Sequence, residues 1–134
     1  MNKLYSLWEA LKTGVAPWTD EVENNDEFVV YRDKYPVTET GHFLVVPKKN
    51  TNQEIEKAVR YAMTVGQENI MDEANPVTGF NIGINWGASA GQTVAFPHVH
   101  LIMRSDGDCE DPTGGVRNVI PGKGNYLNQT KEGL

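Results

Sequence analysis

The sequence predicts a single α+β domain over residues 1–134, in which an antiparallel sheet carries one long helix. Two observations indicate this fold class. Four short segments rich in β-branched and aromatic residues are separated by turn-forming residues, which is typical of strands, and they lie at residues 28–32, 42–47, 80–85 and 94–103. A longer segment at 52–73 repeats its apolar residues with a helical period. A chain of this length can bury a core of its own.

The overall charge limits the kinds of partner that we expect. Twelve Lys and Arg residues against eighteen Asp and Glu residues give a net charge of −6. Such a chain lacks the basic surface of a protein that binds a nucleic-acid polymer, whereas local hydrogen-bond donors can still hold a small anionic ligand. No apolar stretch approaches the roughly 20 residues of a membrane span, and the first residues do not resemble a signal peptide. We therefore expect a cytoplasmic protein that binds neither a polymer nor a membrane.

The N-terminal segment is expected to form a short amphipathic helix over residues 3–13. Its apolar residues recur at helical spacing, and they are Leu4, Leu7, Trp8 and Leu11. Gly14 follows where a helix commonly ends, because glycine readily adopts the left-handed conformation of a C-terminal cap. Residues 17–26 are polar and acidic, so we expect them to be a connection.

The long helix has a recognisable start and stop. Thr51 followed by Glu54 is the pattern of a capping box, and Asn75-Pro76 is a stop signal, so the helix is expected to run from 52 to 73. The residues expected to face the core are Ile55, Ala58, Val59, Ala62, Met63, Gly66 and Ile70.

The segment that follows the long helix alternates apolar and polar or small residues, as a half-buried strand does. The residues expected to face inward are Phe80, Ile82 and Ile84, and those expected on the other side are Asn81, Gly83 and Asn85. The loop 86–91 is rich in glycine and alanine, so its backbone N–H groups can approach a ligand closely. Residues 105–134 hold many glycines and prolines, and we expect a mostly irregular tail.

The last strand carries two histidines, His98 and His100, one residue apart. Side chains two positions apart on a strand project from the same face, so Phe96 and Ile102 are expected to share that face. The residues alone leave three interpretations open. The histidines are polar residues on a solvated face, or two metal ligands with His42 as the third, or imidazoles that act in phosphorus chemistry.

This strand and the turn before it resemble the signature of the histidine triad (HIT) family of nucleotide hydrolases and transferases. The signature is His-φ-His-φ-His-φ-φ, where φ is apolar, and the matching residues are Phe96-Pro97-His98-Val99-His100-Leu101-Ile102, after Gly91-Gln92-Thr93-Val94. Phe96 stands in place of the first histidine. A second family block is similar to residues 31–37 and 41–49, and the resemblance covers about 27–126. Residues 111–117 resemble the tail of the bacterial branch that is similar to diadenosine tetraphosphate hydrolases.

The resemblance implies hydrolysis of a nucleotide derivative, a dinucleoside polyphosphate or a nucleoside phosphoramidate, at its α-phosphorus. In the family the middle histidine, here His98, forms a covalent nucleotidyl intermediate, and a nucleoside monophosphate is released. The further catalytic residues that it implies are His100, His42, Gln92 and Thr93. The substrate-binding residues expected are Asp33 at the ribose hydroxyls, Asn85 at the phosphate, and Tyr31 and Phe28 as walls of the base site.

The family fold implies a homodimer with a continued sheet. We expect no metal in the protein: Cys109 is the only cysteine, so the zinc-binding cysteine pair of many relatives is missing, and a divalent cation would accompany the substrate instead. Phe96 supports an alternative function, a nucleotide-binding module with little or no turnover, because an apolar ring removes a hydrogen-bonding partner beside His98. A histidine-ligated metal hydrolase is the third alternative.

Overall fold

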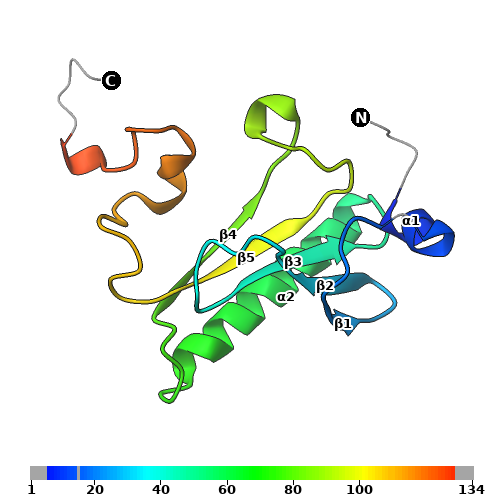
Figure 1. Cartoon of the computed structure of the whole chain (residues 1–134), viewed down its shortest axis with the longest axis horizontal. Coiled ribbons are helices and arrows are strands. Elements are labelled where there is room, and N and C mark those ends of the chain that lie inside the picture. The colour runs from blue at the N-terminus through cyan, green and yellow to red at the C-terminus, as the bar shows by residue number, and fades with distance from the viewer. Residues whose placement is uncertain (1–5, 15, 129–134) are drawn as a thin grey trace.

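The computed structural model describes residues 6–14 and 16–128. Five antiparallel strands form one sheet in the order β1-β2-β3-β5-β4 (Figure 1). The strands are β1 (Glu21–Asn24), β2 (Phe28–Arg32), β3 (His42–Pro47), β4 (Gly79–Ile84) and β5 (Val99–Arg104), and the helices are α1 (Leu7–Thr13) and α2 (Asn52–Met71). The predicted α+β fold class is therefore confirmed.

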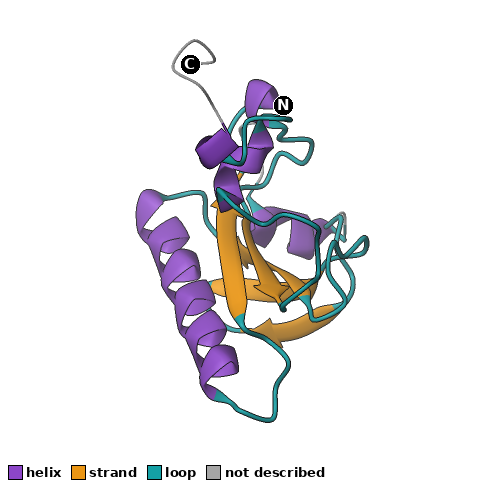
Figure 2. Cartoon of the chain, turned by 90° about the vertical axis from the view of Figure 1, so that its left-hand side faces the viewer, coloured by secondary structure: helices purple, strands orange, loops and turns teal. Residues whose placement is uncertain are grey.

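Helix α2 covers one face of the sheet, as the view turned by 90° shows (Figure 2). Its start is the predicted cap, because Thr51 Oγ1 accepts a hydrogen bond from the Glu54 N–H at 3.2 Å. The core beneath it combines residues of the helix, of the strands and of the segment before β4: Phe28, Val30, Val45, Ala58, Ala62, Val77, Val99, Leu101 and Met103. The main hydrophobic core thus lies between α2 and the sheet.

The buried stripe of α2 is narrower than expected. It runs through Ala58, Ala62 and Gly66, which follow one another at intervals of four residues. Met63 and Ile70, expected in the core, are 43% and 40% exposed, because they lie beside this stripe and not on it.

Gly66 brings α2 close to β4. A Cβ atom added at Gly66 would lie 2.6 Å from Cγ of Phe80, which real Cβ contacts do not allow. Glycine is therefore required where the helix crosses the Phe80 ring, although it is a poor helix former.

Helix α1 covers one end of the opposite face. Ser6 caps it by accepting from the Glu9 N–H, and Gly14 ends it at φ 74° as predicted. The cluster beneath α1 consists of Leu7, Ala10, Val29, Tyr31, Leu44, Val46 and Phe96. Trp8 is 45% exposed, whereas Leu4 lies outside the described residues. Among the described residues, no α-helix covers the remainder of this face.

Strand β5 is shorter than predicted. It begins at Val99, which pairs with Val45 of β3 and Ile84 of β4, so residues 94–98 precede the ladder. Pro97 has no N–H group to donate, which explains why pairing cannot extend through it. His98 therefore stands just ahead of the strand. Ile84, at the far end of β4, is 36% exposed and not the core residue that its alternation predicted.

Strand β1 is absent from the prediction, which treated residues 17–26 as a connection. Its four residues are all exposed, so no apolar alternation marks it. The ladder with β2, which pairs Glu21 with Tyr31, holds it in place. Acidic side chains on an edge strand are a common protection against pairing with other chains.

The tail contains two short 3-10 turns, η2 (Gly115–Val119) and η3 (Tyr126–Asn128). Arg117 donates to the Gly124 carbonyl at 3.2 Å, and Asn125 donates to Asp111 at 2.8 Å, so side chains tie its segments together. Within residues 6–14 and 16–128 no helix has the length and apolar character that crossing a membrane requires.

Candidate active site

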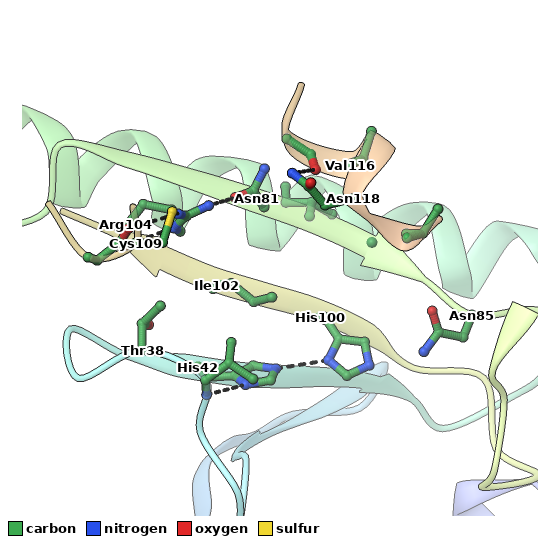
Figure 3. A pocket seen from close by; sticks show the side chains of 16 residues that line it. Thr38, His42, Asn81, Asn85, His100, Ile102, Arg104, Cys109, Val116 and Asn118 are labelled. Atoms are coloured by element: carbon green, nitrogen blue, oxygen red, sulfur yellow. Dashed lines mark hydrogen bonds and ion pairs between the residues drawn. The ribbon is translucent and has the colours of Figure 1, made fainter. Parts of the chain in front are cut away.

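Three histidines meet on the uncovered part of the second face. His42 begins β3, His100 lies in β5, and His98 immediately precedes β5. In the ladder His100 is opposite Leu44 and His42 is opposite Ile102, so the two histidines are diagonal neighbours on one face. Their ring centroids are 5.2 Å apart, and Figure 3 shows the hydrogen bond between them. The sheet register therefore brings together the histidines that the sequence places 58 positions apart.

A backbone amide determines which nitrogens of His42 and His100 carry protons. The Val37 N–H donates to Nδ1 of His42 at 3.2 Å, so this nitrogen is unprotonated and the proton of neutral His42 is on Nε2. Nε2 of His42 lies 2.9 Å from Nδ1 of His100, which must then accept. Neutral His100 consequently carries its proton on Nε2. We assign these tautomers from the hydrogen-bond network.

His98 is the other tautomer, with its proton on Nδ1 instead of Nε2. Its Nδ1 lies 2.8 Å from the Phe96 carbonyl oxygen, which can only accept, so Nδ1 carries the proton. Nε2 of neutral His98 therefore keeps a free lone pair. His98 is 9% exposed, and its ring centroid lies 5.1 Å from that of His100 and, in an edge-to-face arrangement, 5.2 Å from that of Trp18. The arrangement presents an unprotonated nitrogen in a fixed direction.

Burial keeps two of the three imidazoles neutral. Burial, together with the nearby rings of His98 and His42, lowers the pKa of His100 to about 4, against the attraction of Asp33. Burial also lowers the pKa of His42, and the Asp33 carboxylate opposes that shift. Both rings are therefore uncharged near neutral pH, as the tautomer assignment requires.

Asp33 has one carboxylate oxygen in a turn and the other beside the histidines. Its Oδ1 accepts from the Tyr35 N–H at 2.7 Å, an Asx turn, and its Oδ2 lies 3.4 Å from Nε2 of His42. The side chain also lines a cavity of about 340 Å³ in front of His98, which we call the His98 cavity. The Asp33 carboxylate is thus accessible to a ligand in that cavity.

The aromatic walls of the His98 cavity are Trp18 and Tyr35, which the sequence analysis missed. Phe28, expected at the base, lies on the other face beneath α2, where its ring packs on Tyr61 at 4.8 Å. Tyr31 is on the correct face but is 1% exposed behind Trp18, at 5.6 Å between ring centroids. Trp18 follows Pro17 in a segment expected to be a connection, so no sequence pattern marked it as a site residue. Tyr35, in contrast, lies within residues 31–37, which resemble a conserved block of the family.

The loop before β5 supplies further polar groups. Gln92 closes this loop, because its Oε1 accepts from the Gly87 N–H at 2.8 Å and its Nε2 donates to the Val94 carbonyl at 3.1 Å. Its main contacts are therefore internal to the loop, which the sequence did not predict. Thr93 and Asn85 line the His98 cavity, and neither has a hydrogen-bond partner among the residues that the structure describes.

Phe96 was expected on the same strand as His100, but it precedes β5. Its side chain belongs to the cluster under α1 and is 9% exposed, while its carbonyl orients His98. Trp18 contacts both rings, at 6.1 Å from Phe96 and 5.2 Å from His98 between centroids. The aromatic ring that packs against His98 is therefore that of Trp18.

A metal would have to compete with the hydrogen bonds of this site. In the described part of the chain, Asp33, His42 and His100 place ligand atoms within 4.8 Å of one another, so the group that converges is not the trio of His98, His100 and His42 that the alternative of a metal site named. The donor types suit zinc. Ligation by Nε2 of His42, however, needs a lone pair on the nitrogen that the Val37 N–H leaves protonated. The hydrogen-bonded tautomers therefore do not fit a resident metal.

Known proteins are similar to this chain in sequence and in fold. The model of the HIT domain family matches residues 19–107. The AP-4-A phosphorylase of Mycobacterium tuberculosis is 33% identical over 123 residues, covering 78% of this chain and 62% of the relative. The adenylylsulfatase HINT3 of Arabidopsis thaliana is 36% identical over 74 residues, covering 52% of this chain and 38% of the relative. The chain thus spans less than two thirds of either relative's length.

Solved structures are similar over most of the chain. A zinc-bound histidine triad family protein from Mycobacterium smegmatis has a TM-score of 0.63 at 25% identity, with 80% of each chain covered. A histidine triad protein from Clostridium difficile shares the fold with a TM-score of 0.58 at 23% identity, covering 83% of this chain and all of that one. With its three clustered histidines and a family match over most of its length, this chain belongs to the HIT domain family.

Proposed function

We propose that this chain cleaves a nucleotide derivative at its α-phosphorus through a covalent nucleotidyl group on His98, and releases a nucleoside monophosphate. The observation that carries this proposal is the hydrogen bond from His98 to the Phe96 carbonyl, which in the neutral ring leaves the lone pair on Nε2, in a side chain that lines a cavity. An imidazole held in this way is a competent nucleophile without any further base.

The chemistry balances in two steps. Nε2 of His98 bonds to phosphorus while the bond from phosphorus to the leaving group breaks, and the leaving group takes the electron pair and a proton delivered through the Thr93 hydroxyl. Water then attacks the nucleotidyl group, the bond to His98 breaks, and the monophosphate leaves, while the water gives up a proton that replaces the one passed on by the Thr93 hydroxyl. During both steps the Nε2–H of His100 and the Asn85 amide donate to phosphate oxygens.

His42 acts on this site through His100. Its Nε2–H donates a hydrogen bond to Nδ1 of His100. The proton of His100 therefore stays on Nε2, from which it can be donated to the phosphate. Because both groups are neutral, they stabilise the anionic transition state by hydrogen bonds and need no change of protonation.

The nucleoside occupies the His98 cavity in this proposal. The Asp33 carboxylate accepts hydrogen bonds from the ribose hydroxyls, and Trp18 and Tyr35 provide flat apolar walls for the base. Lys34, which lies 5.8 Å from the Tyr35 ring centroid, adds positive charge at the rim of an otherwise acidic chain. A divalent cation would accompany the substrate and not reside in the protein.

The relatives support this substrate class. One is named for phosphorolysis of AP-4-A and another for cleavage of an adenylyl sulfate, and both names describe an adenine nucleotide joined to a leaving group. We accordingly place the chain with the bacterial branch that resembles diadenosine tetraphosphate hydrolases, as a cytoplasmic homodimer joined through the edge strand β4.

A second function is favoured by Phe96. In a nucleotide-binding module without efficient turnover, the same cavity would hold a nucleotide, but the missing imidazole would leave the phosphate without one hydrogen-bonding partner. The test is a screen of adenosine and guanosine dinucleoside polyphosphates and phosphoramidates for monophosphate release. Rapid-quench analysis of a labelled substrate should then locate the label on His98. Tight nucleotide binding with neither product nor adduct would favour the binding module.

A further inference from the structure

Trp18 lies between the space assigned to the base and the ring assigned as the nucleophile. Its half-buried side chain lines the His98 cavity together with Tyr35 and Asp33. Its ring centroid is also 5.2 Å from that of His98, with the two ring planes 62° apart. One indole can therefore contact a ligand in the cavity and the imidazole at the same time.

Two buried aromatic rings also pack against Trp18. Its ring centroid lies 5.6 Å from that of Tyr31 and 6.1 Å from that of Phe96, and these two side chains are 1% and 9% exposed. Both belong to the cluster under α1, against which Trp18 packs. Residue 18 itself lies in neither a helix nor a strand, between the end of α1 and the start of β1. Side-chain packing, and not a backbone ladder, thus holds the indole against His98.

The orientation of His98 depends on such packing. The torsion about the Cβ–Cγ bond of histidine has broad minima, so an imidazole turns easily unless its neighbours restrain it. The Phe96 carbonyl restrains one ring nitrogen, Nδ1, at 2.8 Å. The rings of Trp18 and His100 flank the imidazole, at 5.2 and 5.1 Å between centroids. A shift of the indole would therefore change the direction in which Nε2 of His98 points.

Binding energy from a part of the substrate that does not react can serve to orient the reacting groups. We propose that Trp18 is a positioning residue that couples occupancy of the base site to the orientation of His98. A base that packs on Trp18 fixes the indole, and the indole fixes the imidazole, so the nucleobase accelerates formation of the covalent adduct in addition to improving affinity. This inference rests on the proposed function. It also gives the aromatic ring of Phe96 a part, as one of the supports of Trp18.

The test compares two substrates that differ only in the base. One is adenosine 5′-(4-nitrophenyl phosphate), and the other is the same phosphodiester of 1,4-anhydroribitol, in which hydrogen replaces the base and both ribose hydroxyls remain. Stopped-flow measurement of the first turnover gives the rate of 4-nitrophenol release at saturation and the concentration at half-saturation. In the native chain, removal of the base should lower the saturated rate at least about tenfold and also raise the half-saturating concentration.

Two variants of Trp18 test whether the indole transmits this effect. Trp18→Leu keeps an apolar side chain in the cluster but removes the flat ring, so both substrates should react at the lower saturated rate, within about twofold of each other. Trp18→Phe keeps an aromatic ring and should retain part of the effect of the base on the rate. A residue that served only to bind the base would change the half-saturating concentration and not this ratio of saturated rates.

Two further variants separate positioning from binding and from general packing. Tyr35→Leu removes the other aromatic wall, which is 77% exposed, and should weaken binding of the adenosine substrate while the base still accelerates the first turnover. Trp8→Leu is the matched control, because it makes the same substitution at an indole that is 45% exposed on α1. It should react with both substrates as the native chain does.

Equal saturated rates for the two substrates in the native chain would overturn the coupling and leave the proposed function standing. An undiminished effect of the base in both Trp18 variants, or its loss in Trp8→Leu, would do the same. Release of 4-nitrophenol from neither substrate by the native chain would overturn the proposed function as well. If near-ultraviolet circular dichroism shows that Trp18→Leu has lost its packing, the native chain and Trp18→Phe decide between these outcomes.

Discussion

The two faces of the sheet are made by the same strands, yet they are finished in opposite ways. On the face beneath α2, β3 and β5 present Val45, Val99 and Leu101, each at most 1% exposed. On the other face the intervening positions of the same strands hold His42, His100 and Ile102. Alternation along a strand thus lets one segment serve the core and the site together.

The comparison of the two faces also shows how the fold accommodates buried imidazoles on the face that carries the histidines. Buried imidazoles lose hydration, and hydrogen bonds to Val37, His100 and Phe96 offset that loss on the histidine face. The apolar packing under α2 supplies stability that does not depend on those groups. Changes on the histidine face should therefore alter chemistry, and changes on the helix face should alter stability.

The largest expected effect is on turnover, from His98→Ala. Loss of the nucleophile should lower kcat by at least about a thousandfold, while nucleoside monophosphate binding stays within a few-fold. Steady-state kinetics and titration of the product measure the two quantities. Retention of a tenth of the wild-type kcat would rule out a nucleophilic role for His98, and a large fall in melting temperature would break the separation of the two faces.

Asp33→Ala should weaken ribonucleotide binding by about 1.5–3 kcal/mol, the range for hydrogen bonds to a charged group. A 2′,3′-dideoxynucleotide should hardly respond. Asp33→Asn separates the two roles of the side chain, because the amide oxygen can still accept from the Tyr35 N–H while the charge is gone. If Asp33→Ala weakens both ligands equally and Asp33→Asn restores both, the residue serves only the turn.

On the helix face, Gly66→Ala should destabilise the fold by about 1–2 kcal/mol, because the new methyl group meets the Phe80 ring and this overpacking exceeds the gain in helix propensity. The neighbouring exposed position gives the control: Gln67→Ala should be neutral or slightly stabilising. Denaturant unfolding measures both, and kcat/KM should not change in either variant. A stabilised Gly66→Ala protein would show that α2 can move away from β4 freely.

The last prediction concerns the pH dependence of stability. The folded-state pKa of His100 is about 4 and its ordinary value is 6.5, so between these values the unfolded chain binds more protons. His100 thus makes stability fall as the pH drops from about 6.5 towards 4, and His42 acts in the same direction. His100→Asn should flatten this part of the stability profile. An unchanged slope in urea unfolding across this range would contradict the assigned burial of the ring.

Strong local signals predicted most of the fold. Thr51 and Glu54 cap α2, Gly14 ends α1, and the apolar segments of β2 and β3 match their predicted bounds. Strand β1 escaped prediction because pairing with β2, and not an apolar face, makes it a strand. The start of β5 was misplaced because apolar character continues through Pro97, where backbone pairing cannot.

The candidate site was predictable in its residues but not in its contacts. The family signature located His98 and His100, whereas their link to Val37 depends on the path of a turn that no pattern encodes. Phe28 and Tyr31 are three residues apart, so strand alternation alone places them on opposite faces, and assigning both to the base overlooked this. Trp18 reaches His98 from a distant segment and could only be found in three dimensions.

The hydrogen bond from Val37 to His42 has a consequence for how this site can evolve. The donor belongs to the peptide backbone, so every amino acid except proline supplies it at position 37, and the side chain there is 66% exposed. The protonation of two imidazoles therefore depends on a position whose residue type is nearly free to vary. Chemical constraint and sequence constraint are uncoupled at this point, and the shape of the turn, more than the identity of any residue in it, is what must be inherited.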